Sequence, residues 1–225
     1  MLISPSLLSV ERKKIALIVD ELINLKVKYI HIDVMDKGFI GHTAIKISDF
    51  KKISGKKIKY GIHLMVNNPR KYAKKFIALG AKTIIFHYES FSNNMSIAKF
   101  ISDLHVLNVK VGIAFKPNTK IEDAFFFIKM VDIVLIMTVE PGKGGQTFNK
   151  KMLKKIKICS EYIKKNNLKT SIEVDGGINN KTCIECWKNG VNILVIGSYL
   201  FNGASIKKQI DSISNIYREF KNFKI

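Results

Sequence analysis

Two histidines and two aspartates stand in short apolar segments of the kind that form buried strands. His31 and Asp33 lie two residues apart in YIHIDVM. His63 lies in GIHLMV, and Asp175 ends SIEVD. Because alternate residues of a strand share one face, these polar residues lie opposite the isoleucines, leucines and valines of their segments. A buried histidine or aspartate without a partner is costly, so we expect the four side chains to share a divalent cation.

Two imidazoles and two carboxylates make a mixed nitrogen and oxygen donor set. This set suits Zn²⁺, Fe²⁺, Mn²⁺ or Co²⁺, whereas Mg²⁺ and Ca²⁺ prefer oxygen ligands alone. Which of the four ions is native stays open. Glu173 and Ser6 share the inward face of their strands, where they could hydrogen bond to the ligands or to substrate. Any one of these residues alone could be an ordinary hydrogen-bonded core group, but their common face favours a site.

Three glycine-containing segments form a second group of candidate residues. VEPGKGGQTF, VDGGI and VIGSYLF each overlap or follow the end of an expected strand. Glycine lets the backbone approach a ligand and point N–H groups at it, and barrel loops after the seventh and eighth strands commonly hold phosphate. Lys143 could reach that phosphate or remain in solvent. We predict a site for a sugar phosphate that includes Gly142, Gly144, Gly145, Gly176, Gly177, Gly197 and Ser198.

Eight short apolar segments alternate with eight helix-like segments, which predicts parallel strands joined by right-handed crossovers. Eight such units close into a (β/α)₈ barrel, or TIM barrel, with its site at the C-terminal ends of the strands. An open doubly wound sheet is the alternative, but no GxGxxG follows the first strand. We expect one barrel domain over residues 1–225. The expected strands are Leu2–Leu7, Tyr29–Met35, Ile58–Val66, Lys82–His87, Val109–Ala114, Ile133–Val139, Thr170–Asp175 and Ile193–Ile196, and the clearest helices are Glu11–Lys26, Pro69–Leu79, Met95–Leu107 and Asn149–Asn166.

Composition excludes several classes of protein. The 225 residues are 47% hydrophobic and 25% charged, which suits a single globular domain. No apolar run approaches the roughly 18 residues of a membrane helix, and the N-terminus does not resemble a signal peptide, so we expect a cytoplasmic protein without membrane contact. The net charge of +20 comes almost entirely from lysines spread over helix faces. Without clustered arginines and aromatic residues, no nucleic acid partner is expected, although the charge favours capture of an anionic substrate.

Three cysteines offer a weaker alternative for metal binding. Cys183 and Cys186 form a CxxC motif, but it lies in a helix-like segment, and Cys159 stands apart. A structural zinc site needs four ligands, and the chain has no second pair of cysteines. Ordinary packing of the three thiols is therefore favoured.

Five motifs, SPSLL, HIDVMD, HLMV, MTVEPGKGGQTF and EVDGGI, together resemble the ribulose-phosphate 3-epimerase family. The likeness runs in order from Leu2 to about Phe201. It implies an isomerase of the pentose phosphate pathway, part of carbohydrate metabolism, that interconverts D-ribulose 5-phosphate and D-xylulose 5-phosphate, and it implies a homo-oligomer. By this resemblance the metal ligands are His31, Asp33, His63 and Asp175, the catalytic acid/base pair is Asp33 and Asp175, and the substrate-binding residues include Ser6, His63 and the glycine segments.

Epimerisation at C3 requires a proton to leave one face of the carbon and another to arrive on the opposite face. Asp33 and Asp175 come from well-separated strands and could flank a planar enediolate, exchanging roles in the reverse direction. The metal would stabilise the enediolate as a Lewis acid at the C2 and C3 oxygens. Met35, Met65 and Met137 match methionines of the family and are expected to confine the enediolate, although an inward methionine more often serves packing.

One segment departs from the family. Its members usually continue HIDVMD with GHFVPN, whereas this chain has KGFIGHTAIK, and no residue role is carried over from that segment. An epimerase of a ketohexose 6-phosphate such as D-allulose 6-phosphate is the alternative function. It would use the same metal, acids and phosphate site, and the altered segment is where an extra carbon could fit.

Overall fold

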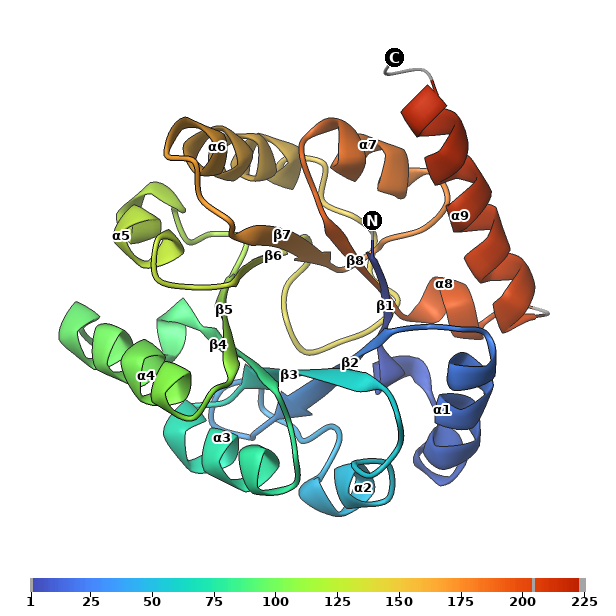
Figure 1. Cartoon of the computed structure of the whole chain (residues 1–225), viewed down its shortest axis with the longest axis horizontal. Helices are drawn as coiled ribbons and strands as arrows, with labels where there is room; N and C mark the ends of the chain where they lie inside the picture. Colours follow the sequence, from blue (N-terminus) through green and yellow to red (C-terminus); the bar gives the residue numbers. More distant parts are fainter. Residues whose placement is uncertain (1, 204, 223–225) are drawn as a thin grey trace.

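The structure is a computed structural model that describes residues 2–203 and 205–222. In this part of the chain, eight parallel strands form one sheet in the order β1-β8-β7-β6-β5-β4-β3-β2. A parallel bridge between Ser6 and His31 joins the two edges of the sheet and closes the barrel. Figure 1 looks along the barrel and shows the strands as an inner ring with the helices around it. The predicted (β/α)₈ barrel is confirmed.

The strands lie where the apolar segments predicted them, to within two residues at each end. The second and eighth predicted strands have the observed bounds. The first ends earlier than predicted, because Leu7–Ser9 turns into a short 3₁₀ helix in which Ser6 Oγ accepts the N–H of Leu8 at 3.2 Å. The strands are β1 (Leu2–Pro5), β2 (Tyr29–Met35), β3 (Lys59–Met65), β4 (Thr83–His87), β5 (Lys110–Phe115), β6 (Ile133–Met137), β7 (Ser171–Asp175) and β8 (Ile193–Ile196).

The helices cover the outside of the barrel, and the helix predicted from Pro69 begins at that residue, whereas the one predicted from Asn149 begins later, at Met152. Asn68 caps the helix that starts at Pro69 by accepting the N–H of Lys71. The first helix starts later than predicted because Arg12–Lys14 is a 3₁₀ turn. The helices are α1 (Ile15–Asn24), α2 (Ile47–Lys51), α3 (Pro69–Ala78), α4 (Asn94–Val106), α5 (Phe125–Ile128), α6 (Met152–Lys165), α7 (Thr182–Lys188), α8 (Ser198–Phe201) and α9 (Ile206–Asn222).

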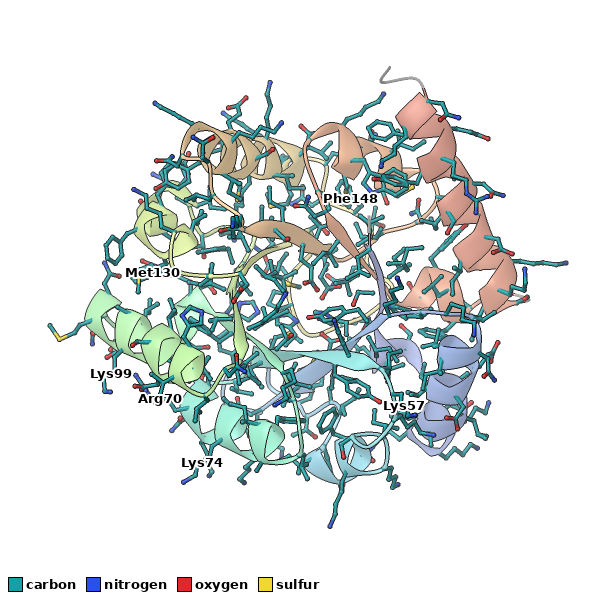
Figure 2. The ribbon with its side chains drawn as sticks, viewed as in Figure 1. Lys57, Arg70, Lys74, Lys99, Met130 and Phe148 are labelled. Carbon is teal, nitrogen blue, oxygen red and sulfur yellow. The ribbon has the colours of Figure 1, made fainter. Side chains whose placement is uncertain are left out.

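The two faces of each strand differ as the alternation predicted. Ile30, Ile32 and Val34 of β2 belong to the large apolar cluster that packs the strands against the helices. Side chains also fill the centre of the barrel (Figure 2), as expected for this fold. Strands β4, β5 and β6 give the lumen a small apolar cluster of its own, which comprises Ile85, Ala114, Leu135, Met137 and Val139.

The three cysteines pack in the core as expected. Cys159 on α6 and the pair Cys183 and Cys186 on α7 are buried and free. Burial raises the pKa of Cys159 to about 12 and that of Cys183 to about 11, so both thiols stay protonated at neutral pH. This pattern suits packing rather than redox chemistry or metal binding.

The outer surface carries the lysines. Lys74 and Lys99, labelled in Figure 2, project from α3 and α4 on the outside of the barrel. Arg70, also on α3, is bound to Asp103 on α4 at 2.7 Å rather than free to read a partner. None of the described helices is both long and apolar enough to cross a membrane.

Candidate active site

The four predicted ligands meet at the C-terminal ends of three strands. His31 and Asp33 come from β2, His63 from β3 and Asp175 from the end of β7, and one donor atom of each lies within 4.8 Å of the others. The parallel register places Asp33 beside His63. This register explains why Asp33 Oδ1 lies 3.2 Å from His63 Nδ1, and alternation along β2 explains why it lies 3.3 Å from His31 Nε2.

Asp175 approaches the same two imidazoles from the far side of the barrel. Its Oδ2 lies 3.7 Å from His31 Nε2 and 3.8 Å from His63 Nδ1. The two ring nitrogens are themselves 3.1 Å apart. Two nitrogens and two carboxylate oxygens thus converge on one small volume, which is the donor arrangement expected around a transition-metal ion.

The two aspartates differ in their tendency to hold a proton. Burial and the negative charge of Asp33 raise the pKa of Asp175 to about 7. Burial acts the same way on Asp33, but the charge and hydrogen bond of His31 outweigh it and keep the pKa of Asp33 well below its usual range. Around neutral pH, Asp33 is therefore ionised while Asp175 exchanges a proton readily, which suits a pair of groups with opposite proton-transfer roles.

The two histidines also differ. Burial lowers the pKa of His63 to about 3, so its imidazole is neutral and has a lone pair for a cation. Burial opposes the charge on His31, but the negative charge of Asp33 and the hydrogen bonds that His31 donates to Asp33 and Glu173 raise its pKa well above the ordinary value. A metal ion at this point would take the place of the extra proton on His31, because both satisfy the same carboxylates.

Glu173 and Ser6 stand behind the ligands, where the alternation along their strands predicted them. His31 Nδ1 donates to Glu173 Oε1 at 3.0 Å, so the nitrogen Nε2 faces the other ligands. Glu173 Oε2 has no hydrogen-bond partner among the described residues. Ser6 Oγ donates to Asp33 Oδ2 at 2.6 Å and so orients that carboxylate.

His87 and Glu89 were missed by the sequence analysis. His87 ends β4 and lies 2.9 Å from His63, measured between the two Nε2 atoms. Its Nδ1 donates to Glu89 Oε2 at 3.1 Å. The segment TIIFHYE contained a signal for His87, because it shares the inward parity of Ile85 on the same strand.

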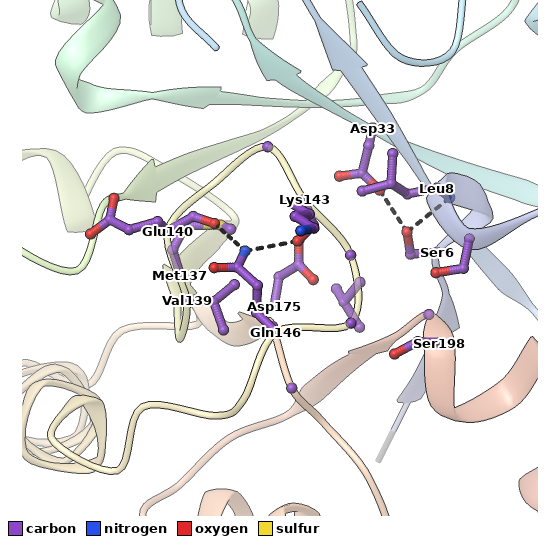
Figure 3. Close-up of a pocket in the computed structure, with 18 of the residues that line it drawn as sticks. Ser6, Leu8, Asp33, Met137, Val139, Glu140, Lys143, Gln146, Asp175 and Ser198 are labelled. Atoms are coloured by element: carbon purple, nitrogen blue, oxygen red, sulfur yellow. Dashed lines mark hydrogen bonds between the residues drawn. The ribbon is translucent and has the colours of Figure 1, made fainter. Parts of the chain in front are cut away.

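One pocket opens above the ligand group, at the mouth of the barrel. Figure 3 shows it between the segment that follows β6 and the start of α8. His31 and His63 lie below its floor and are fully buried. Its lining contains these predicted residues: Ser6, Asp33, Met35, Met65, Met137, Gly142, Gly144, Gly145, Asp175, Gly176, Gly177, Gly197 and Ser198.

The glycines of the pocket allow backbone segments to approach each other. Gly177 has φ +66°, and a Cβ there would lie 2.4 Å from the backbone nitrogen of Phe148. Gly176 has φ +119°, and its Cβ would meet Val139 at 2.4 Å. Only glycine fits both the conformation and the space. Gly197 precedes the short extra helix α8, the element that often completes a phosphate site in this fold.

The segment between β6 and α6 crosses the mouth of the barrel, in yellow in Figure 1. Gln146 secures it, because its Nε2 donates to the backbone oxygens of Glu140 and Lys143 at 2.7 and 2.8 Å (Figure 3). Lys143 also lines the pocket.

Comparison with known proteins points to one family. The model of the ribulose-phosphate 3 epimerase family matches residues 2–201. The ribulose-phosphate 3-epimerase of Schizosaccharomyces pombe is 33% identical over 217 residues, which cover 95% of this chain and 92% of that protein. The enzyme of the same name from Helicobacter pylori is 31% identical over 219 residues, which cover 96% and 98%.

Solved structures show the same fold at lower identity. The 3-hexulose-6-phosphate synthase of Salmonella typhimurium aligns with a TM-score of 0.72 at 14% identity, over 98% of this chain and 100% of that one. The orotidine 5'-phosphate decarboxylase of Pyrococcus horikoshii aligns with a TM-score of 0.65 at 13% identity, over 98% and 99%. At this identity the likeness concerns the barrel alone.

Proposed function

The chain belongs to the ribulose-phosphate 3-epimerase family, and from this we propose that it interconverts D-ribulose 5-phosphate and D-xylulose 5-phosphate by inversion at C3. It is an isomerase that acts on a carbohydrate phosphate, and its reaction belongs to the pentose phosphate pathway. The main observation behind the proposal is that Asp33 and Asp175 lie close together at the base of a pocket that is also lined by glycines. The relatives carry the name of the pentose phosphate enzyme, which does not favour the ketohexose alternative.

Two carboxyl groups perform the proton transfers. Asp33 and Asp175 come from β2 and β7 and line the same pocket. One removes the C3 proton, and the other delivers a proton to the opposite face of the planar intermediate. The roles exchange in the reverse direction.

The donor set fits a divalent cation, held by His31, Asp33, His63 and Asp175. Two nitrogens and two carboxylate oxygens suit Zn²⁺, Fe²⁺, Mn²⁺ or Co²⁺, from which we propose that the native ion comes. When bound, such an ion stabilises negative charge on substrate oxygens as a Lewis acid. Glu173 orients His31 for this role through the hydrogen bond at 3.0 Å.

The remaining pocket residues bind and enclose the substrate. The backbone around Gly177 and Gly197, with the Ser198 hydroxyl, supplies hydrogen-bond donors for the phosphate. Ser6 keeps Asp33 oriented towards the sugar. Met35, Met65 and Met137 form apolar walls that exclude water from the enediolate. By family resemblance we further propose a homo-oligomer, and from the composition we propose that it works in the cytoplasm without a nucleic acid partner.

Proton exchange tests the function. We expect the protein, incubated with ribulose 5-phosphate in D₂O, to incorporate deuterium at C3 as xylulose 5-phosphate appears, both followed by NMR. The control substrate is allulose 6-phosphate, for which exchange should be slow or absent. Exchange from the ketohexose phosphate alone would move the assignment to the alternative epimerase, and exchange from neither would overturn the proposal.

Removal of the metal should reduce the rate by about 10²-fold or more, because a Lewis acid supplies several kcal/mol of charge stabilisation. The midpoint of thermal unfolding should also fall, because an ion that binds the folded protein and not the unfolded chain stabilises the folded state. We would dialyse the protein against a chelator, verify the metal content by elemental analysis, and measure both quantities before and after adding back each of the four ions. Ca²⁺ is the matched control and should restore neither. Full turnover by verified metal-free protein would contradict the prediction.

A further inference from the structure

Hydrogen bonds lead away from the back of His63 to a second layer of side chains. His63 Nε2 lies 2.9 Å from Nε2 of His87, and His87 Nδ1 lies 3.1 Å from Glu89 Oε2. Both imidazoles are fully buried, and their rings stack with centroids 5.0 Å apart. This series of hydrogen bonds ends at Glu89. The Glu89 carboxylate is held in place because its Oε1 accepts the backbone N–H of Lys116 at 2.8 Å and the hydroxyl of Thr119.

The number of protons on the two imidazoles assigns a donor and an acceptor to each hydrogen bond between His63, His87 and Glu89. Of the two His63 nitrogens, Nδ1 faces the other ligands, so it needs an unprotonated lone pair to bind a cation. The His63 proton then sits on Nε2 and is donated to His87 Nε2. His87 Nε2 is therefore the acceptor, so the proton of His87 sits on Nδ1 and is donated to the Glu89 carboxylate.

The other tautomer of His63, with its proton on Nδ1, competes with this one. His63 Nδ1 also lies 3.2 Å from Asp33 Oδ1, so a proton on Nδ1 would find a strong acceptor there. That tautomer would block the lone pair needed for a cation. Because His87 presents an acceptor to Nε2, and Glu89 keeps His87 in the tautomer that does so, the network favours the form of His63 that can bind metal.

The two histidine ligands are thus oriented by different means. His31 is held directly by the carboxylate of Glu173 at 3.0 Å. His63 reaches the carboxylate of Glu89 through an intervening imidazole. The second arrangement extends from β3 across β4 to the segment after β5, where Lys116 and Thr119 lie. It connects one metal ligand with a loop at the mouth of the barrel.

The two histidines of the network are also shielded from solvent. The ring of Phe39 lies 5.1 Å from that of His87, and the ammonium group of Lys116 lies 4.0 Å from the centre of the Phe39 ring. Phe39 belongs to the segment after β2 whose sequence departs from the usual motif of the family. Low water access strengthens the hydrogen bonds between His63, His87 and Glu89.

We propose that His87 and Glu89 are positioning residues that hold His63 in its metal-binding tautomer. This inference rests on the metal site of the proposed function. It concerns affinity for the ion rather than contact with substrate, so it can fail or hold independently of the epimerase reaction.

The test is metal affinity in two variants, Glu89→Gln and His87→Gln. We would measure the dissociation constant for Co²⁺ by competition with a chelator and follow the visible absorption of the bound ion. Each variant should bind Co²⁺ about 10- to 100-fold more weakly than the wild type. Because His87 and Glu89 act on His63 through the same series of hydrogen bonds, the double variant should lose little more Co²⁺ affinity than either single variant.

Two controls isolate the positioning role. Thr119→Val removes one donor to Glu89 but leaves the path from His63 to Glu89 intact, so the Co²⁺ affinity should change only slightly. His105→Gln removes a histidine on α4 that takes no part in the network and should change nothing. Thermal unfolding of each variant verifies that it folds. Glu89→Gln is the decisive variant, because Glu89 is only partly buried and its substitution should not prevent folding.

The tautomer itself provides a second measurement. In metal-free wild-type protein, ¹⁵N NMR of the histidine rings should show the His63 proton on Nε2, and Glu89→Gln should shift it towards Nδ1. Unchanged Co²⁺ affinity in folded Glu89→Gln, or a wild-type proton on Nδ1, would overturn the inference. Tight Co²⁺ binding without epimerisation by the wild type would instead reject the proposed function and leave the positioning role standing.

Discussion

Replacement of Asp175 by asparagine is expected to abolish epimerisation while the barrel still folds. Asparagine has nearly the same shape and keeps one oxygen that can face a cation, but it cannot accept or deliver the C3 proton. Loss of one positioned acid/base group costs about 10²–10⁴-fold in rate. Asp33→Asn should have an effect of the same order, because inversion requires a group on each face of the carbon. The measurement is turnover from each epimer separately, with metal content determined for each preparation.

Isotope exchange makes this prediction sharper. If the two carboxyl groups face opposite sides of C3, each variant keeps one group and should still exchange the proton of one epimer with D₂O. The exchangeable epimer should be opposite for Asp33→Asn and Asp175→Asn. Asp211→Asn is the matched control, because it makes the same change from carboxylate to amide on exposed α9, outside the pocket and the ligand group, and its activity should stay near that of the wild type. Normal turnover by either asparagine variant with full metal content would reject the two-base mechanism.

Gly177→Ala is expected to disrupt binding of the phosphate group. The new Cβ would lie 2.4 Å from the nitrogen and 2.7 Å from the Cα of Phe148, both backbone atoms that cannot rotate away. The segment after β6 must therefore move relative to β7, and the N–H groups aimed at the phosphate move with it. Each lost hydrogen bond to a charged group costs about 1.5–3 kcal/mol, so kcat/KM should fall about 10- to 100-fold or more. Steady-state kinetics and competitive inhibition by inorganic phosphate measure the effect.

Gly80→Ala separates this clash from simple backbone strain. Gly80 follows α3 with φ +90°, but a Cβ there would meet no atom within 4 Å. The substitution should cost about 1–2 kcal/mol of stability, from the left-handed conformation alone, and leave the kinetics unchanged. A Gly177→Ala protein that is still inhibited by phosphate as strongly as the wild type would show that this backbone does not bind the phosphate.

The sequence was sufficient for the fold and for the convergence of His31, Asp33, His63 and Asp175 in the lumen. Alternation of apolar and helix-like segments predicted eight strands, and all eight lie within two residues of their predicted bounds. The alternation of side chains along each strand also predicted that four residues face the lumen together: His31, Asp33, His63 and Asp175. These features are local, because the direction of a side chain along a strand depends only on its neighbours in the same strand.

The distances between side chains could not be predicted, because they depend on how the strands align around the barrel. His31 and Glu173 are 142 residues apart in the sequence, and no local pattern reports that they are hydrogen bonded. Ser6 reaches Asp33 only because the bridge between Ser6 and His31 closes the barrel in one register. The same alignment brings Ile85, Ala114 and Leu135 together into an apolar cluster in the lumen, which no single strand reveals.

The electrostatic character of the site also belongs to the tertiary structure. In the sequence, Asp33 and Asp175 are equivalent carboxyl groups. Their pKa values separate because the folded barrel surrounds Asp33 with imidazoles and places Asp175 beside the charge of Asp33. The partnership of His87 with His63 arises in the same way. Sequence periodicity thus determined which residues face inward, whereas barrel closure decided which of them touch, and contact sets both proton affinity and hydrogen bonding.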